Sequence, residues 1–471
     1  MFRDKLKNAE LMPTFDDVYI IPGKAPVDPH QVDLRSKFSK NVELIVPVAS
    51  APMDTVTCDE LAIVLALHGA LGVIHRNCSV EEQLKMVNTV KNSPPIPLSN
   101  VFARANDPCQ RVLELMKGSG VRELPVVNDV GRVLGYVELR DVMELCRSDL
   151  SKEVSSIVKP RKSYYLKFVQ EAVREIIEGR RDAIAILASD GSYVGTITLR
   201  EALEDVTPLL DEEGRLRVGA AVSPFDANRA KALDKVADVL VSDIAHFHNV
   251  NALSAARNLV KELSSDFVAG NIGTYEAAID VLTIVERVDG LRVGLGGGSI
   301  CITPEVGGAY APTLWAVAAV RDALEELGAR DTPIIADGGI RSPGDAVKAL
   351  AAGASSVMLG YVFAGTQEAC APLIAIGSQL YKPYRGMASR GAMERRFAAD
   401  RYTRVVKRVP EGVEGLVKFK GSAANVLREF VEGIKAGLGY AGARNIRELW
   451  SVAKFGRTAK KVVPSELRTS L

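Results

Sequence analysis

The chain has 471 residues, of which 47% are hydrophobic and 25% are charged, and its formal net charge is +1. This length predicts two or three domains, and the balanced charge argues against a nucleic-acid partner or an electrostatically bound membrane partner. No apolar run approaches the roughly 20 residues of a membrane span, and the N-terminus carries no apolar segment of signal-peptide length.

Eight short apolar segments recur along the chain, and helix-like stretches separate most of them. The segments are rich in β-branched residues, as expected for parallel strands that are buried on both faces. Their alternation with helices predicts an α/β fold, a (β/α)8 TIM barrel, with a doubly wound open sheet as the alternative because strand counting cannot show closure. The expected strands are 44–50, 71–75, 218–223, 238–243, 266–271, 291–296, 332–339 and 355–360.

Roughly 140 residues separate the second and third expected strands, which is too long for a loop and predicts an inserted domain. Within this region residues 121–145 resemble residues 181–205, and each copy reads as a strand, a turn, a second strand starting at glycine and a helix. A tandem repeat of this kind is typical of a small regulatory module, and a purely structural insert is the alternative. The expected domains are 1–94 and 208–471 for the barrel and 95–207 for the insert.

The loop after the sixth expected strand, GLGGGSICITPEV at 294–306, places Cys301 directly behind a glycine run. Further glycines follow the seventh and eighth strands, where barrels of this kind commonly bind phosphate through backbone N–H groups. Asp337, beside those glycines, is a candidate acceptor for a ribose diol. The pattern predicts a site for a nucleoside monophosphate next to a nucleophilic sulfur; a plain turn with a buried cysteine is the alternative.

The six cysteines are scattered and form no CxxC pair, so we expect neither a disulfide framework nor a structural zinc site. A reducing cytoplasm is then the expected location. His75, His246 and His248 follow two of the strands, but their spacing with carboxylates does not favour a metal site. Residues 381–421 form a long, basic, glycine-rich stretch, which predicts a mobile flap over the site, with a disordered surface excursion as the alternative.

Several separated motifs, in matching order and spacing, resemble inosine-5′-monophosphate (IMP) dehydrogenase over almost the full chain. The insert resembles the tandem CBS pair (Bateman domain) of that family. The matching motifs are TFDDVYIIPG (14–23), PMDTVT (52–57), GVIHRN (72–77), GGGSICIT (296–303), IADGGIRSPGD (335–345), YRGMASRGAM (384–393), DRY (400–402) and VPEGVEG (409–415).

The resemblance implies the oxidation of IMP by NAD to xanthosine 5′-monophosphate, a step of guanine nucleotide biosynthesis, in a cytoplasmic homotetramer. Cys301 would add to the purine C2, hydride would leave to the nicotinamide, and a covalent thioimidate would remain. Arg401, next to Tyr402, would activate water for hydrolysis, although arginine is an unusual base because its pKa is high. Thr303 and Glu411 match the family's alternative proton path.

The resemblance also implies a binding role for each of several residues. No dinucleotide-binding fingerprint is needed, because GLGGGS does not open a helix of a βαβ unit. Phosphate would contact Ser299, Gly339, Gly360, Tyr361 and Tyr384; ribose would contact Asp337; the base would contact Met53, Gly386, Met387 and Glu411; NAD would contact Asp243 and Asn271; and the carbonyls of Gly296, Gly298 and Cys301 would bind potassium.

The chain departs from the family pattern at four positions near the site and at its C-terminal end. Gly297, Pro304, Thr313 and Tyr361 stand where relatives more often carry proline, a polar residue, glutamine and serine. The closing sequence GRTAKKVVPSELRTSL lacks the longer tail that helps to complete the potassium site in relatives, so potassium activation stays open.

The insert also departs from its family pattern. Nucleotide sites of CBS repeats often use Thr or Ser three residues before Asp, but the first copy has Glu138 and Asp141, and the second has Thr198 and Glu201. Binding of an adenine or guanine nucleotide by the insert therefore stays open.

Two other functions compete with IMP oxidation. GMP reductase shares the barrel and the cysteine and performs an NADPH-dependent reductive deamination. It normally lacks the flap pair Arg401–Tyr402 and usually lacks the insert, so both features favour the dehydrogenase. A non-catalytic purine nucleotide sensor would have no need for these residues together with Cys301, Thr303 and Glu411.

Overall fold

The computed structural model describes residues 2–204, 206–395, 397, 400 and 409–457. By its contacts the chain divides into two compact units, one of Met1–Ser93 with Thr207–Leu471 and one of Pro94–Val206. These divisions lie within one residue of the domain boundaries expected from the sequence. Among the described residues, no helix combines the length and the apolar character that crossing a membrane requires.

Eight parallel strands form the centre of the larger unit, in the order β4-β17-β16-β15-β14-β13-β12-β5. The end strands meet through a parallel bridge between Ala49 and Leu71, where the Leu71 N–H donates to the Val48 carbonyl at 3.1 Å. The sheet is therefore a closed TIM barrel, which excludes the open-sheet alternative. The strands are β4 Val48–Ser50, β5 Val73–Ile74, β12 Gly219–Val222, β13 Val239–Ser242, β14 Asp266–Ile272, β15 Gly290–Val293, β16 Ile334–Asp337 and β17 Ser356–Leu359.

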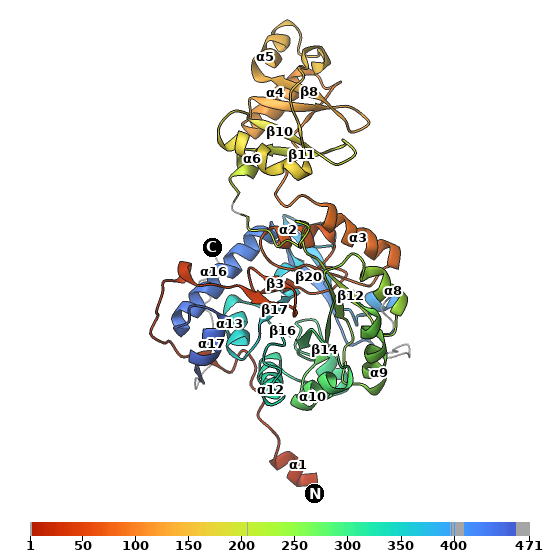
Figure 1. The fold of residues 1–471 in the computed structure, drawn as a ribbon, viewed down its shortest axis with the longest axis vertical. Coiled ribbons are helices and arrows are strands. Elements are labelled where there is room, and N and C mark those ends of the chain that lie inside the picture. The colour runs from red at the N-terminus through yellow and green to blue at the C-terminus, as the bar shows by residue number, and fades with distance from the viewer. Residues whose placement is uncertain (1, 205, 396, 398–399, 401–408, 458–471) are drawn as a thin grey trace. The chain divides into compact units, whose positions relative to one another are not determined.

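The barrel has two apolar layers because successive strand side chains point to opposite faces. Val239 and Val241 belong to the inner cluster with Phe38, whereas Leu240 between them packs against the helices. The helices surround the strands (Figure 1). They are α2 Asp59–Leu67, α3 Val80–Asn92, α8 Ala227–Leu233, α9 Val250–Leu259, α10 Tyr275–Ile284, α12 Thr313–Glu326, α13 Pro343–Ala351, α14 Tyr361–Ala364, α16 Ala423–Ala441 and α17 Ile446–Val452.

The insert contains the two repeats that the sequence predicts, and each has its own three-stranded sheet and apolar cluster. The second strand of each repeat begins two residues before the glycine expected to start it. Gly135 has a φ of +152°, and a Cβ atom there would lie 2.4 Å from the Lys159 carbonyl oxygen. The elements are β6 Ala103–Arg104, α4 Cys109–Ser119, β7 Glu123–Val127, β8 Val133–Glu138 and α5 Leu139–Ser148, then β9 Tyr164–Tyr165, α6 Val169–Ile177, β10 Ala183–Leu187, β11 Tyr193–Thr198 and α7 Leu199–Ala202.

The structure contains two disulfides, so the expectation of none is wrong. Cys58 pairs with Cys370 in the larger unit, and Cys109 pairs with Cys146 in the insert, whereas Cys78 and Cys301 are free. Sequence spacing missed both bonds because folding brings together cysteines that lie 312 and 37 residues apart. The inference of a reducing cytoplasm consequently loses its support from cysteine usage.

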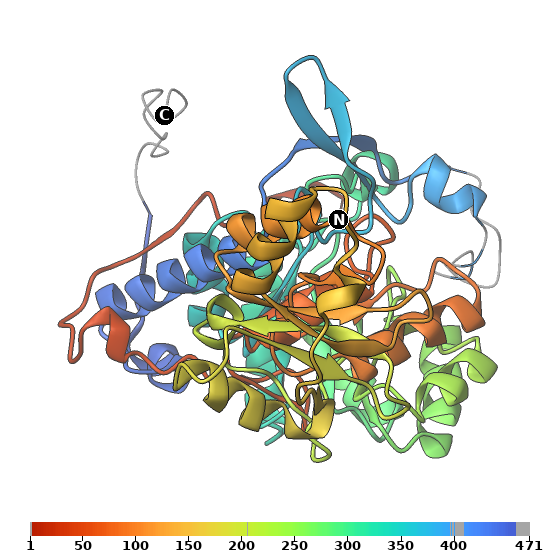
Figure 2. The ribbon, with the colours of Figure 1, turned by 90° about the horizontal axis from the view of Figure 1, so that it is seen from above.

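Part of the segment expected as a flap is regular structure. Three antiparallel strands, β18 Ile374–Ile376, β19 Gln379–Arg385 and β20 Glu414–Lys418, form one sheet in sequence order. The hairpin of β18 and β19, in light blue, stands out from the neighbouring ribbon in Figure 2. The helix α15 Arg390–Glu394 follows β19. Residues 401–408 lie outside the described residues.

Candidate active site

A cavity of about 540 Å³ lies at the carboxyl ends of the barrel strands. This volume is within the range of small-molecule sites. Loops after β4, β13, β14, β15, β16 and β17 all contribute to its wall, together with the segment after β19. Its lining includes Met53, His246, His248, Asn271, Gly296, Gly298, Ser299, Cys301, Thr303, Asp337, Gly339, Gly360, Tyr361, Tyr384, Gly386, Met387 and Glu411.

The loop that carries Cys301 folds tightly against the end of β16. Gly294 has a φ of +132°, and a Cβ atom there would lie 2.1 Å from the Asp337 carbonyl oxygen, so only glycine fits. The Cys301 N–H donates to the Gly298 carbonyl at 3.0 Å. On its other side the loop pairs with residues 411–413, since the Ile302 N–H donates to the Glu411 carbonyl at 2.9 Å. Backbone contacts therefore fix the position of the thiol.

Two hydrogen bonds connect the Cys301 thiol to a carboxylate. The Cys301 Sγ donates to the Thr303 hydroxyl at 3.2 Å, and that hydroxyl donates to the Glu411 Oε2 at 2.8 Å. Both partners line the same cavity as the sulfur. This arrangement can move a proton between the sulfur, or a species bound to it, and Glu411.

Glycines and a buried tyrosine form the end of the cavity where a phosphate was expected. At Gly360 a Cβ atom would lie 3.0 Å from the Met53 Sδ and 3.1 Å from the Tyr384 hydroxyl. Burial raises the pKa of Tyr384 to about 12, although a hydrogen bond with Ser299 acts in the opposite direction. Gly339 has a φ of +75°. This end therefore offers exposed backbone and a protonated phenol.

Tyr361 lines the same end of the cavity. Its ring lies 6.1 Å from the Tyr384 ring and 4.4 Å from the Lys420 Nζ, and that ammonium donates to the Tyr361 carbonyl at 2.7 Å. Burial lowers the pKa of Lys420 to about 8. The sequence did not identify Lys420, which follows β20 along the chain and reaches Tyr361 only in the folded barrel.

Asp337 projects into the cavity between two donors. Its Oδ2 accepts from the Arg292 Nε at 2.9 Å and from the Asn271 Nδ2 at 2.8 Å. Arg292 was not identified from the sequence. A charged residue within a buried strand needs a partner, so its place in the sixth expected strand could have pointed to this site. Asp243 is fully buried, lies 3.4 Å from both Arg76 and Arg292, and does not line the cavity that the described residues form.

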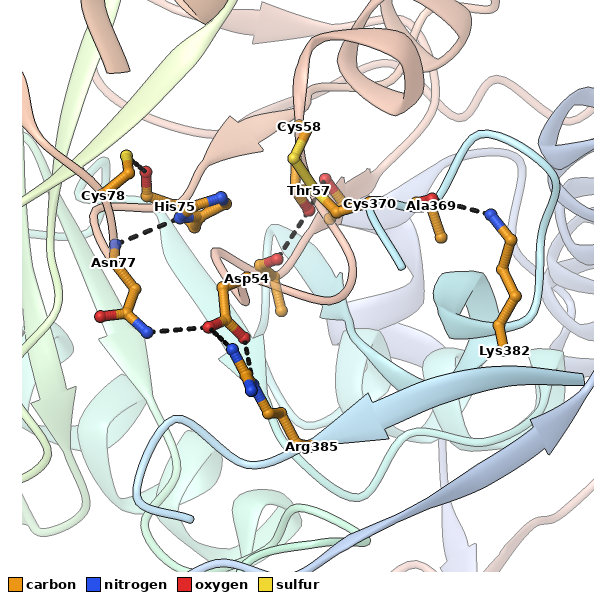
Figure 3. Close-up of a disulfide and its surroundings, with 12 residues drawn as sticks. Asp54, Thr57, Cys58, His75, Asn77, Cys78, Ala369, Cys370, Lys382 and Arg385 are labelled. Atoms are coloured by element: carbon orange, nitrogen blue, oxygen red, sulfur yellow. Dashed lines mark hydrogen bonds and ion pairs between the residues drawn. A yellow bond between two sulfur atoms is a disulfide. The ribbon is translucent and has the colours of Figure 1, made fainter. Parts of the chain in front are cut away.

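The opposite wall holds the residues expected beside the base. The Asp54 N–H contacts the Met387 Sδ at 3.5 Å, and Arg385 donates two hydrogen bonds to the Asp54 carboxylate (Figure 3). Burial raises the pKa of Asp54, but the bonds from Arg385 and Asn77 outweigh it and hold the pKa below its usual value. The loop after β4 and the segment after β19 are thereby joined next to Met53.

The departures in the glycine loop have local partners. The Thr313 hydroxyl donates to the Asp337 carbonyl at 3.0 Å, and Gly297 lies next to Thr313 and Gly339. Pro304 is in the first turn of the short helix α11 Thr303–Gly307 and packs over Gly296. These contacts close the loop against β16.

Two other expectations concern the histidines and the flap pair. His246 and His248 line the cavity, and the His248 Nε2 lies 2.7 Å from the Asp280 Oδ2. Arg401 and Tyr402 lie outside the described residues. Asp400, which precedes them, accepts a hydrogen bond of 2.6 Å from the buried Arg76.

The insert has a separate polar cavity of about 780 Å³. Its wall includes Arg122, Arg140, Arg147 and Arg180. Of the four residues considered for nucleotide binding, Glu138 lines this cavity and the other three are engaged elsewhere. The Thr198 hydroxyl and the Glu201 carboxylate bond to each other at 2.5 Å in a helix cap, and Asp141 pairs with Lys159.

Comparison with known proteins places the chain in a family. Residues 12–465 match the model of the IMP dehydrogenase / GMP reductase domain. The inosine-5′-monophosphate dehydrogenase of Korarchaeum cryptofilum is 44% identical, over 94% of this chain and 93% of that protein. The enzyme of the same name from Halobacterium salinarum is 40% identical, over 97% of this chain and 93% of that protein.

Solved structures that match this chain include proteins named for the second activity in the family model. Two structures of a cysteine-to-alanine variant of Trypanosoma brucei GMP reductase, one of them in complex with guanosine 5′-monophosphate, match 99% of this chain. They cover 98% and 100% of their own chains, with 34% and 32% identity and TM-scores of 0.72 and 0.77. Because these reductases match along the insert too, the insert does not separate the two activities as expected. The chain belongs to the IMP dehydrogenase / GMP reductase family.

Proposed function

We propose that the protein oxidises IMP with NAD to xanthosine 5′-monophosphate through a covalent adduct on Cys301. The observation that carries this proposal is the hydrogen-bonded series Cys301–Thr303–Glu411 in the wall of a cavity that several glycines also line. Full-length relatives named as IMP dehydrogenases support it.

IMP would lie between the two walls of the cavity. Its phosphate would accept hydrogen bonds from the backbone at Gly339 and Gly360 and from the Tyr384 hydroxyl, in a lining that also includes Ser299 and Tyr361. Its ribose hydroxyls would donate to Asp337. The purine would then extend past Cys301 toward the wall of Met53, Gly386, Met387 and Glu411. This orientation would bring C2 next to the Cys301 sulfur.

The chemistry divides into two steps. The Cys301 thiol loses its proton toward Thr303 and Glu411, the sulfur bonds to C2, and the hydride of C2 leaves. NAD would accept this hydride when bound, and Asn271, which was expected near its nicotinamide side, lies in the cavity wall. Water then adds to C2, the carbon–sulfur bond breaks, and the cysteine regains a proton.

Water activation has two candidate bases. Thr303 and Glu411 could accept the proton of water through the same hydrogen bonds that serve the thiol. Arg401, beside Tyr402, is the base that the family resemblance implies. We propose that Arg401 acts in hydrolysis, with the threonine–glutamate pair as the second path.

Potassium and assembly extend the proposal. The carbonyls of Gly296, Gly298 and Cys301 lie on one tight loop, and carbonyl oxygens suit a hard monovalent cation. A bound ion would hold the cysteine loop in place. We propose that potassium stimulates turnover and that the protein acts as a homotetramer. Turnover measured in potassium, in sodium and without either cation tests the first statement. The molar mass in solution, measured by light scattering, tests the second.

The insert is proposed to bind an adenine or guanine nucleotide. Arg140 and Arg147 in the wall of its polar cavity support this, because guanidinium groups recognise phosphate in bidentate geometry. Arg122 in the same wall donates to the Asp182 carboxylate, and Glu123, Glu138 and Glu144 also line the cavity. Titration of the full-length protein with ATP and GTP, followed by calorimetry, tests the proposal. Heat that persists with IMP present is the expected result, and no heat for either nucleotide would contradict it.

The reaction itself is tested by absorbance at the nicotinamide band. Purified protein with IMP and NAD should form NADH, whereas GMP with NADPH should leave NADPH unchanged. Consumption of NADPH with GMP would instead identify a GMP reductase, the activity of the matched solved structures. Tight IMP binding without either reaction would favour a nucleotide sensor.

A further inference from the structure

The disulfide between Cys58 and Cys370 lies beside the wall that is expected to contact the base. Cys58 ends the loop 51–58 that follows β4, and Cys370 lies between α14 and β18, 312 residues later in the chain. Their Cα atoms are 5.5 Å apart. Figure 3 shows that the bond joins the loop to the segment that leads toward β19.

The loop 51–58 depends on this region for its position. The Thr57 hydroxyl donates to the Ala51 carbonyl at 2.7 Å, which closes the loop on itself. The Cys370 N–H donates to the Val56 carbonyl at 3.2 Å, next to the disulfide. The loop is thus attached to the segment around Cys370 by one covalent bond and one hydrogen bond.

A second set of contacts connects the same segment to β19. The buried Lys382 ammonium donates to the carbonyls of Gln367 and Ala369, at 2.7 and 2.8 Å. Three residues further along β19, Arg385 binds the Asp54 carboxylate in the loop 51–58. These contacts therefore connect the loop 51–58 to the segment around Cys370, that segment to β19, and β19 back to the loop. Met53 belongs to the loop 51–58 and Met387 lies two residues after β19, and both line the cavity.

His75 lies next to the disulfide, and a ring nitrogen comes within 4.8 Å of both sulfur atoms. The His75 Nδ1 accepts a hydrogen bond from the Asn77 N–H at 3.1 Å. Burial lowers the pKa of His75 to about 4, so the ring is neutral at pH 7 with its proton on Nε2. Because the two sulfurs are bonded to each other, neither is a thiolate, which is the form of cysteine that binds a metal ion.

We propose that the Cys58–Cys370 disulfide is a positioning bond that holds the loop 51–58 in the geometry that binds the purine. Both cysteines are half-buried, so an external dithiol can reach them. Reduction by such a dithiol breaks the bond, adds two electrons and two protons to the two sulfurs, and leaves the dithiol as its own disulfide. The effect on substrate rests on the proposed function, whereas the effect on the loop does not.

The test compares three full-length proteins, each with and without dithiothreitol. They are the wild type, the double variant Cys58→Ser with Cys370→Ser, and a control that replaces the other disulfide, Cys109→Ser with Cys146→Ser. The Kd and KM of IMP should rise about tenfold in the Cys58/Cys370 variant, through lost preorganisation, while kcat stays within about twofold. Dithiothreitol should bring the wild type to the same values and leave that variant unchanged. The control should keep the wild-type Kd.

Two further readouts do not require turnover. Mass mapping of the protein purified without reductant should recover the Cys58–Cys370 peptide pair, and hydrogen exchange in the loop 51–58 should accelerate on reduction. Free thiols at both positions would overturn the proposal. So would a double variant with unchanged loop exchange and unchanged IMP affinity. If the protein does not oxidise IMP but the loop exchange still depends on reduction, only the proposed function fails.

Discussion

Replacement of Thr303 by Val tests the proton path that connects the thiol to a carboxylate. The change removes one hydroxyl and breaks two hydrogen bonds together, from the Cys301 Sγ at 3.2 Å and to the Glu411 Oε2 at 2.8 Å. A neutral hydrogen bond contributes about 1 kcal/mol and one to a charged group about 1.5–3 kcal/mol. If both act in the transition state, the barrier rises by about 2.7 kcal/mol, which is a loss of about 100-fold in kcat.

The assay measures NADH formation at saturating IMP and NAD, together with the Kd of IMP by calorimetry. We expect kcat to fall about 100-fold and the Kd to change by less than about twofold, because Thr303 is not expected to contact bound IMP. Thr283→Val is the matched control, since its hydroxyl donates to the Ile279 carbonyl within α10, away from the cavity. A Thr303→Val protein that keeps more than half of the wild-type kcat would refute the path.

Three further predictions concern substrate binding and stability. Gly360→Ala should raise the Kd of IMP at least about tenfold in calorimetry, because its Cβ atom would lie 3.0 Å from the Met53 Sδ, and an unchanged Kd would contradict the phosphate assignment. Burial raises the pKa of Asp211, but hydrogen bonds led by that from Lys91 outweigh it and lower the pKa to about 2, so Asp211 stabilises the fold above pH 4 and loses this effect as the pH falls toward 2. The Asp211→Asn variant should therefore have a lower free energy of unfolding in urea than the wild type at pH 7. If the difference in this free energy does not narrow between pH 4 and 2, the stabilising role of ionised Asp211 is contradicted. Replacement of Cys109 and Cys146 by Ser should lower the free energy of unfolding of the insert by about 2–4 kcal/mol in the same assay. An unchanged free energy would show that the disulfide does not constrain the unfolded insert.

The sequence was sufficient for the barrel strands because their apolar, β-branched runs leave few other solutions. It overestimated their lengths where a run continues into other structure. The first expected strand began at Leu44, but that residue pairs in the short hairpin of β2 Ser36–Lys37 and β3 Glu43–Leu44 and packs in the inner cluster with Phe38. Residues of the hairpin and of the barrel strand are both buried and apolar, so apolar character cannot tell where one ends and the other begins.

Local motifs predicted the places of Cys301, Thr303 and Asp337 in the cavity, because Asp337 ends β16 and the other two follow the glycine run after β15. Contacts that arise only from the closed barrel could not be read in this way. The disulfide partner of Cys58 lies 312 residues away, and Lys420 reaches Tyr361 across 59 residues. Asp243 also follows a strand, but it is buried and pairs with Arg76, which follows β5, and with Arg292 of β15.

The central claim is that IMP is oxidised as an adduct of Cys301. The most direct measurement mixes the protein with IMP and NAD, quenches with acid, and determines the mass of the peptide that contains Cys301. We predict NADH together with a peptide heavier by IMP less two hydrogens, and neither signal in Cys301→Ala. NADH formation with an unmodified Cys301 peptide, or turnover by Cys301→Ala, would contradict the account.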